Sequence, residues 1–215
     1  MRKLVVFDLD GTLVDSVPDL TDCVNITLKK FGHGIRSEKE IAQMIGNGAR
    51  NLIIRAVGDA LSEQEIDQRL NYYNDIYTNC GNPKTKLFDG IYQVLIELKK
   101  RGFMLGILTN KPQSATEKVY QSYLSDIGFD AIIGQNSSVK IKPDPTALLE
   151  CIEKLGVNKQ NVYMVGDGEP DAQVAINAKV NGISVLYGYR TKEQLTAVGA
   201  TVFAEKVSDL IDLIK

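Results

Sequence analysis

The sequence is poor in the residues that build soft-metal sites and disulfide frameworks. It has one histidine, His33, and three cysteines, Cys23, Cys80 and Cys151, whose spacing matches no metal-binding pattern. A metal site built from several histidines is therefore excluded. An odd number of cysteines without such spacing predicts reduced thiols in a cytoplasmic protein.

Long apolar runs and an excess of either charge are missing as well. Lysine and arginine number 25 against 27 acidic residues, and no basic stripe or polybasic tract occurs, so we expect no nucleic-acid and no membrane partner. The longest apolar stretches are strand-sized, which excludes a transmembrane span, and the first one is too short for a signal peptide. What is present is 215 residues, 44% of them hydrophobic, enough for one domain with an insertion or two small domains. Monomer and homodimer both stay open.

Two aspartates after the first apolar run are the most informative feature. Residues 4–7 are typical of a buried strand, and Asp8 and Asp10 follow with one residue between them. Alternate residues of a strand point to the same face, so both carboxylates should emerge side by side, and Gly11 lets the chain turn away. Two like charges this close repel unless one is protonated or a cation lies between them. The pattern predicts a nucleophile, an acid and a metal site within three residues.

The rest of the chain divides into a helical segment and an alternating segment. Residues 16–82 have little strand character and two capping-box patterns, which favours a helical bundle. From about residue 87 strands and helices alternate, which predicts the α/β class: a doubly wound, mostly parallel sheet with helices on both faces. Residues 1–15 and 83–215 would form this Rossmann-like core, with 16–82 inserted as a helical cap. The expected helices cover 89–101, 112–124, 145–155 and 170–179, and the expected strands cover 103–108, 130–133, 161–165, 182–186 and 200–203.

Polar residues follow several of these strands or open the helices after them. Because the carboxyl ends of parallel strands share one edge of a sheet, these residues should meet there. They are Asp8 and Asp10, Thr109 and Asn110, Lys142, and Asp167 with Asp171. Lys142 would supply positive charge to a transferring phosphoryl group, and Thr109 a hydroxyl and a backbone N–H. Lys140 competes for the lysine role, but the proline after Lys142 favours Lys142.

The converging carboxylates imply a cation. Unit charges ~4 Å apart interact by ~4 kcal/mol at an effective dielectric of ~20, so Asp8, Asp10 and Asp167 would strain the fold without compensation. Oxygen ligands select a hard ion, and Mg²⁺ best fits a site that also binds phosphate. Asp171, one helical turn beyond Asp167, can orient a metal-bound water.

These four segments resemble the motifs of the haloacid dehalogenase (HAD) superfamily of phosphohydrolases. The segments are Asp8–Ser16, Leu108–Asn110, Lys142–Pro145 and Gly166–Asp171, and their order and spacing cover nearly the whole chain. The inserted helices, with Ile45–Leu52 and Thr109–Pro112, are similar to the phosphoglycolate phosphatase-like branch with its small helical cap. Two stretches depart from the family pattern without touching a predicted catalytic side chain: Ser138–Ile141 and Lys179–Asn181.

The resemblance implies hydrolysis in two steps. Asp8 would attack phosphorus and form an aspartyl-phosphate. Asp10 would give a proton to the leaving alcohol and then take one from the hydrolytic water, assistance typically worth ~10²–10⁴-fold. Mg²⁺ would be held by Asp8, the backbone carbonyl of Asp10, and Asp167. A carboxylate suits the nucleophile because it is ionised at neutral pH and needs no activating base.

The expected substrate contacts lie mainly in the helical segment. Gly46, Asn47 and Gly48 form either a turn between two helices or a loop that grips substrate. Arg50 is either a surface arginine or the partner of a substrate carboxylate, since its planar fork suits bidentate pairing. Asn110 would contact substrate from the core. Three tyrosines at helical spacing favour core packing over substrate contact: Tyr72, Tyr73 and Tyr77.

Several functions stay open at this point. A small phosphorylated metabolite is the expected partner, and 2-phosphoglycolate is the first substrate hypothesis. A phosphosugar phosphatase or a sugar phosphomutase of the same fold is the enzyme alternative. From another class, the chain could be a phosphate-binding or phospho-accepting regulator, which Asp10 disfavours because a resident acid/base hastens hydrolysis. The sequence does not decide the oligomeric state, the rate, or whether Glu169 contacts the metal.

Overall fold

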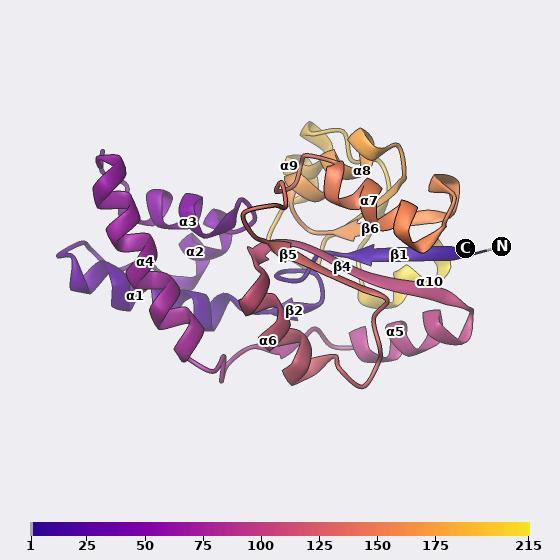
Figure 1. The fold of residues 1–215 in the computed structure, drawn as a ribbon, viewed down its shortest axis with the longest axis horizontal. Coiled ribbons are helices and arrows are strands. Elements are labelled where there is room, and N and C mark those ends of the chain that lie inside the picture. Colours follow the sequence, from indigo (N-terminus) through magenta and orange to yellow (C-terminus); the bar gives the residue numbers. More distant parts are fainter. Residues whose placement is uncertain (1) are drawn as a thin grey trace.

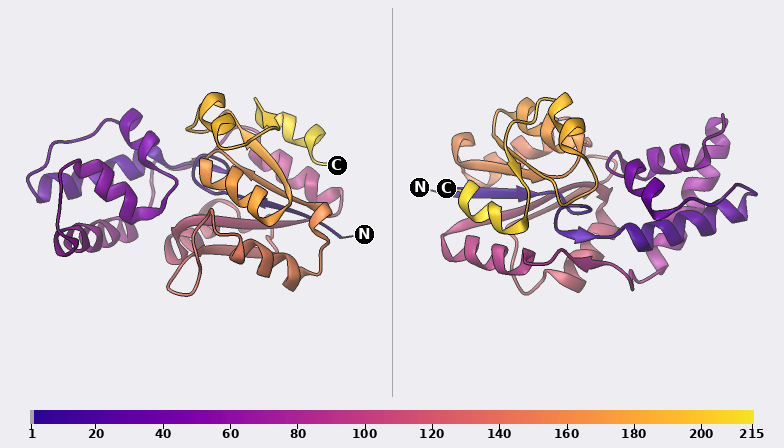
Figure 2. Two further views of the ribbon diagram at one scale, coloured as in Figure 1. Left: turned by 90° about the horizontal axis from the view of Figure 1, so that it is seen from above. Right: turned by 180° about the vertical axis from the view of Figure 1, so that it is seen from behind.

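A computed structural model describes residues 2–215, in which helices cover a parallel sheet and four more helices gather at one end (Figures 1 and 2). Six strands form the sheet in the order β5-β4-β1-β6-β7-β8, and every neighbouring pair is parallel. They are β1 (Lys3–Phe7), β4 (Phe103–Pro112), β5 (Ala131–Gln135), β6 (Val162–Gly166), β7 (Asn181–Val185) and β8 (Phe203–Ala204). The predicted fold class is confirmed.

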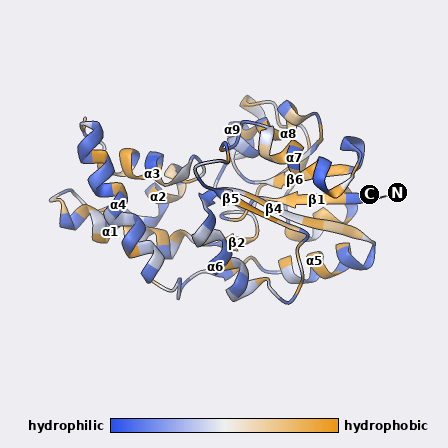
Figure 3. Cartoon of the chain, in the orientation of Figure 1, coloured by the Kyte–Doolittle hydropathy of each residue, from blue (hydrophilic) through white to orange (hydrophobic). Residues whose placement is uncertain are grey.

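The helices of this part cover both faces of the sheet. They are α5 (Ile91–Lys100), α6 (Gln113–Tyr123), α7 (Thr146–Leu155), α8 (Glu169–Ala178), α9 (Lys192–Ala197) and α10 (Leu210–Leu213). Val5 and Phe7 of β1 pack in one buried cluster with α5, α6 and α10, while Leu4 and Val6 pack in another with α7 and α8. A strand buried on both faces needs apolar residues on both of them, as β1 has from Leu4 to Phe7 (Figure 3).

The four remaining helices form the cap segment between the first strand and the rest of the sheet. They are α1 (Val17–Lys30), α2 (Glu38–Met44), α3 (Gly48–Val57) and α4 (Glu63–Asn79). They bury their own apolar cluster, which includes Leu28, Ile41 and Ile53. Both predicted capping boxes are present, at Ser37 before α2 and at Ser62 before α4. These helices lie inside the predicted range 16–82.

A short antiparallel pair joins the cap segment to the sheet. Strand β2 (Val14–Asp15) pairs with β3 (Lys86–Leu87) in antiparallel orientation, so the chain leaves the core and returns to it through two neighbouring strands. Asp19 of α1 is buried and accepts hydrogen bonds from the backbone of Lys84 and from the backbone and hydroxyl of Thr85. The returning segment is therefore fixed to the first cap helix.

The structure corrects several expected element boundaries. β4 runs to Pro112, beyond the expected end at residue 108, with a register shift against β5 after Leu108. The last strand covers 203–204 rather than 200–203. Ser16 is the residue before α1, but its hydroxyl bonds to Asp10 instead of capping the helix. Within residues 2–215, the helices are all too short or too polar to cross a bilayer.

Candidate active site

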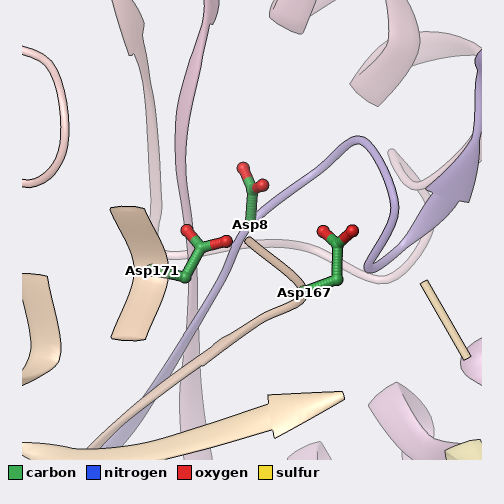
Figure 4. Close-up of side chains that lie close together, drawn as sticks. All are labelled: Asp8, Asp167 and Asp171. Carbon is green, nitrogen blue, oxygen red and sulfur yellow. The ribbon is translucent and has the colours of Figure 1, made fainter. Parts of the chain in front are cut away.

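Three carboxylates from distant parts of the sequence meet at the carboxyl edge of the sheet (Figure 4). Asp8 follows β1, Asp167 follows β6, and Asp171 lies in the first turn of α8. One oxygen of each lies within 4.8 Å of the others, and all three residues are buried. The parallel pairing of β1 with β6 brings them together, because neighbouring parallel strands end on the same edge.

Buried Lys142 is the ammonium group that contacts this cluster. Its Nζ lies 2.6 Å from Asp171 Oδ1 and 2.8 Å from Asp8 Oδ1. Burial, with Asp8 and then Asp171 adding, raises the pKa of Asp167 to about 8. Burial and Asp8 raise the pKa of Asp171 to about 6, against the lowering by Lys142. Burial alone would lower the pKa of Lys142, but Asp171 and Asp8 outweigh it and raise that pKa.

The donor set of this cluster fits a divalent cation. Asp8 Oδ1 is buried, and among the described residues no donor makes an aligned hydrogen bond to it, although Lys142 Nζ is close. Three carboxylates against one ammonium leave two formal negative charges in a buried place. Oxygen ligands without nitrogen or sulfur suit a hard ion such as Mg²⁺. A bound divalent ion would balance this charge.

Asp167 is held in place by close backbone packing. Thr12 Oγ1 donates to its Oδ1 at 3.2 Å, and the backbone N–H of Tyr189 donates to its Oδ2 at 2.9 Å. Gly11 has a φ of +86°, and a Cβ there would lie 2.4 Å from Asp167 Oδ2. A Cβ on Gly188 would lie 2.3 Å from Asp167 Cβ. Both glycines are therefore required for the backbone to approach this carboxylate so closely.

Asp10 has an environment of its own beside the cluster. Lys111 Nζ lies 2.8 and 2.9 Å from its two oxygens, and Ser16 Oγ donates to Oδ1 at 2.6 Å. The side chain of Asp10 is thus bound to a lysine and a hydroxyl rather than placed among Asp8, Asp167 and Asp171. A role for Asp10 in metal binding concerns its backbone carbonyl and stays a prediction.

Thr109 and Asn110 lie within the last part of β4 rather than after its end, because the strand continues to Pro112. Asn110 Nδ2 donates to the carbonyls of Gly46, at 2.9 Å, and Lys142, at 3.0 Å, and its Oδ1 accepts from the backbone of Lys142 at 2.8 Å. Asn110 therefore connects the core to the cap segment and fixes the segment that carries Lys142. Thr109 Oγ1 accepts from the backbone of Lys111.

A cavity lies between the cap segment and the core. Asp8, Asp10, Thr109, Asn110 and Lys111 line it from the core. Its lining from the cap includes Gly46, Gly48, Tyr73 and Tyr77. The two predicted loop glycines thus face the space above the carboxylates, whereas Asn47 is the residue before α3 and lies outside the lining. The tyrosines are packed in the cap core, as expected, and line the cavity as well.

Arg50 pairs with carboxylates of the cap segment and does not line the cavity in this structure. Its guanidinium pairs with Glu63 and, at 2.5 Å, with Asp67, both of α4. Arg50 is partly exposed and is not among the described residues that line the cavity. The carboxylates that use its planar fork here belong to the protein itself, and a substrate contact of Arg50 stays a prediction.

Comparison with known proteins places this geometry in a family. The profile of the haloacid dehalogenase-like hydrolases matches residues 5–185. The chain belongs to this family. Phosphoglycolate phosphatase of Psychrobacter arcticus is 34% identical over 98% of this chain and 95% of its own length, and phosphoglycolate phosphatase 1 of Pseudomonas aeruginosa is 33% identical over 98% and 79%. The resemblance drawn from the motifs is confirmed.

Solved structures of the family agree with the fold. A predicted phosphoglycolate phosphatase from Haemophilus somnus superposes with a TM-score of 0.90 at 28% identity, over 100% of this chain and 98% of that one. A predicted phosphatase from Clostridium acetobutylicum gives 0.87 at 28% identity, over 100% and 98%. The likeness covers the cap segment as well as the sheet.

One contact between core and cap was not expected from the sequence. Buried Arg190 donates to the carbonyls of Ala42, at 2.9 Å, and Ile45, at 2.6 Å, at the end of α2. Its Nε lies 2.8 Å from Glu169, so Glu169 is engaged with an arginine beside the carboxylate cluster. We call these contacts the Arg190 bridge. They hold the cap segment over the cavity.

Lys111 was also missed as a site residue. The motif Thr109–Pro112 contains it, yet it is one of 25 basic residues, and its sequence neighbourhood does not indicate that it is buried. The extension of β4 beyond Leu108 carries it into the site. The sequence feature that could have identified Lys111 is its position two residues after Thr109, next to the edge of the sheet where ligands bind.

Proposed function

We propose that this chain is a Mg²⁺-dependent phosphomonoester hydrolase that works through an aspartyl-phosphate on Asp8, with 2-phosphoglycolate as its first candidate substrate. The observation that carries the proposal is that two carboxylates with different surroundings lie at one cavity. Asp8 belongs to a cluster that fits a divalent cation, while Asp10 is held apart by Lys111 and Ser16. The relatives named phosphoglycolate phosphatase support the substrate.

The first step is attack by Asp8 on phosphorus. Lys142, at 2.8 Å from Asp8, holds the carboxylate in place and offers positive charge to the phosphoryl oxygens. The Thr109 hydroxyl lines the cavity and serves as a further contact for those oxygens. Asp8, Asp167 and the backbone carbonyl of Asp10 would hold Mg²⁺, with Asp171 beside them, and the ion would supply charge that stabilises the transferring group.

Proton transfer belongs to Asp10. It lines the cavity, so in its protonated form it can give that proton to the leaving alcohol as the ester bond breaks. With the alcohol gone, it accepts a proton from the water that attacks the aspartyl-phosphate, which returns Asp8 to its free form. Lys111 and Ser16 keep this carboxyl oriented in both steps.

The enclosing cap supports chemistry away from bulk water. The Arg190 bridge and the Asn110–Gly46 hydrogen bond connect core to cap around the cavity. We propose that the cap opens to admit substrate and closes for the reaction, because closure strengthens electrostatic stabilisation inside the site.

Release of inorganic phosphate from a panel of esters tests the proposal. The purified chain should release phosphate from 2-phosphoglycolate in the presence of Mg²⁺, and a chelator should abolish the release. Asp8→Asn should remove turnover while circular dichroism shows an intact fold. Substantial turnover by Asp8→Asn, or full activity in chelator, would refute the nucleophile or the metal. Transfer of phosphate between sugar positions with little release would instead identify a phosphomutase.

A further inference from the structure

We infer that Lys111 and Tyr77 form a recognition site for a substrate carboxylate, and that this pair selects acidic two- or three-carbon phosphate esters. The inference rests on the proposed phosphatase function. It names the residues that recognise the part of the substrate other than the phosphoryl group. Lys111 and Tyr77 here take the role that the sequence suggested for Arg50, which is paired with Glu63 and Asp67 of α4.

Lys111 provides the positive charge for such a site. Its side chain is only 3% exposed, and among the described residues that line the cavity it is the one cation. An ammonium group has three N–H donors, and two of them are directed at the oxygens of Asp10, at 2.8 and 2.9 Å. One donor is left for a ligand in the cavity.

Tyr77 supplies the independent observation. Its hydroxyl is buried, and within the described residues 2–215 it has no hydrogen-bond partner, although Tyr77 lines the cavity. Buried polar groups are nearly always hydrogen-bonded, so the unpartnered hydroxyl of a residue that lines the cavity is a candidate hydrogen-bond partner for a ligand. Lys111 Nζ lies 4.7 Å from the centre of the Tyr77 ring, so the ammonium group lies over the ring that carries this hydroxyl.

The chemistry of the remaining lining favours a small anion at that place. Leu20, Ile45 and Leu52 are apolar, and the amide donors of Asn110 are already used on the carbonyls of Gly46 and Lys142. A neutral hydroxyalkyl group would offer the third N–H of Lys111 only an uncharged acceptor. A carboxylate accepts from both Lys111 and Tyr77, and hydrogen bonds to charged groups are the stronger kind.

Geometry also sets the length of the ligand. The phosphoryl group must reach Asp8 and its leaving oxygen must reach Asp10, and Lys111 is in direct contact with Asp10. The carboxylate therefore lies only a short carbon chain away from the ester oxygen. This spacing fits a phosphorylated 2-hydroxy acid better than a sugar phosphate, whose several hydroxyls would face apolar side chains.

A matched pair of substrates tests the assignment. 2-Phosphoglycolate and 2-hydroxyethyl phosphate have the same chain length and differ in the carboxylate, so the ratio of their kcat/KM values isolates its recognition. The wild-type chain should prefer 2-phosphoglycolate. Tyr77→Phe should lower the ratio about tenfold, mainly through KM, since it removes one hydrogen bond to a charged group. Lys111→Met should lower it about a hundredfold and reduce kcat for both esters, because Asp10 also loses its partner.

Control variants separate recognition from structure. Tyr72→Phe changes a neighbouring tyrosine of α4 that packs against Phe31, and Arg50→Met removes the arginine paired within the cap; both should leave the ratio unchanged. Thermal unfolding should show Tyr77→Phe at least as stable as the wild type, because its hydroxyl has no protein partner to lose. A purely structural role for Tyr77 predicts a loss of stability instead.

The possible results lead to distinct conclusions. If the wild type hydrolyses neither ester nor any other in the panel, the proposed function fails. If it hydrolyses both esters equally, or if Tyr77→Phe and Lys111→Met leave the ratio unchanged, carboxylate recognition by this pair is wrong while the phosphatase function stands. A drop of the ratio in Arg50→Met alone would return the role to Arg50.

Discussion

The buried carboxylate cluster should make the metal-free protein lose stability as the pH rises from 6 to 8. Asp167 has a pKa of about 8 in the folded chain, against an ordinary value near 3.8. In the unfolded chain this group is ionised at both pH values, whereas in the folded chain it is protonated at pH 6. The folded state therefore binds more protons in this window, and stability falls as the pH rises.

The size of the fall follows from the same pKa. At pH 6 about one folded molecule in a hundred has Asp167 ionised, and at pH 8 about half do. Linkage converts this change into about 2 kcal/mol lost between the two pH values. Asp171, with a pKa of about 6, adds less over this range. For a chain of this size, 2 kcal/mol corresponds to roughly 4–8 °C in Tm.

Thermal unfolding in a chelator at pH 6, 7 and 8 measures this effect. The Tm should fall with rising pH in the wild type, and excess Mg²⁺ should stabilise the protein more at pH 8, because the ion competes with the proton for the cluster. Asp167→Asn cannot titrate and should lose most of the pH dependence, while the exposed control Asp212→Asn should keep it. A Tm that is constant or rises from pH 6 to 8 in chelator would refute the electrostatic account of this site.

Three substitutions test other parts of the site. Lys142→Met should leave buried carboxylates without their ammonium, which costs about 3–5 kcal/mol in metal-free protein by denaturant unfolding; a loss under 1 kcal/mol would contradict the buried pairing. Gly188→Ala should cost about 1–3 kcal/mol and weaken Mg²⁺ binding by calorimetry, because a Cβ there would lie 2.3 Å from Asp167 Cβ; unchanged affinity would show that the backbone yields freely. Arg190→Ala should raise KM and the radius of gyration in solution scattering, since the bridge to α2 is gone; Lys192→Ala, beside it, should change neither.

Much of the core could be predicted because its signals are local. The four-residue apolar run of β1 and the alternation of strands and helices predict a parallel sheet, and strand ends in such a sheet meet at one edge. The carboxylates of Asp8 and Asp167 therefore lie together, as expected. Capping boxes identified the starts of α2 and α4 for the same reason, since all their partners lie within three residues.

The features that were missed depend on partners far away in the sequence. The pairing of Arg50 with Glu63 and Asp67 of α4 was not expected, because tertiary packing creates it. Lys111 and Arg190 resemble ordinary surface residues in the sequence, and only tertiary packing buries them. The β2–β3 pair was also missed, because two-residue strands carry no periodicity that could reveal them.

The short β2–β3 pair also makes the helical segment exchangeable in principle. Its two ends, Asp15 and Lys86, are paired with each other, so a brief loop could join them across one antiparallel step. Every strand of the six-stranded sheet lies outside that interval, and so do Asp8, Lys142 and Asp167. Replacing residues 17–85 with a lid of another shape could therefore change the substrate preference while Asp8, Lys142, Asp167 and the Ser16 partner of Asp10 are kept.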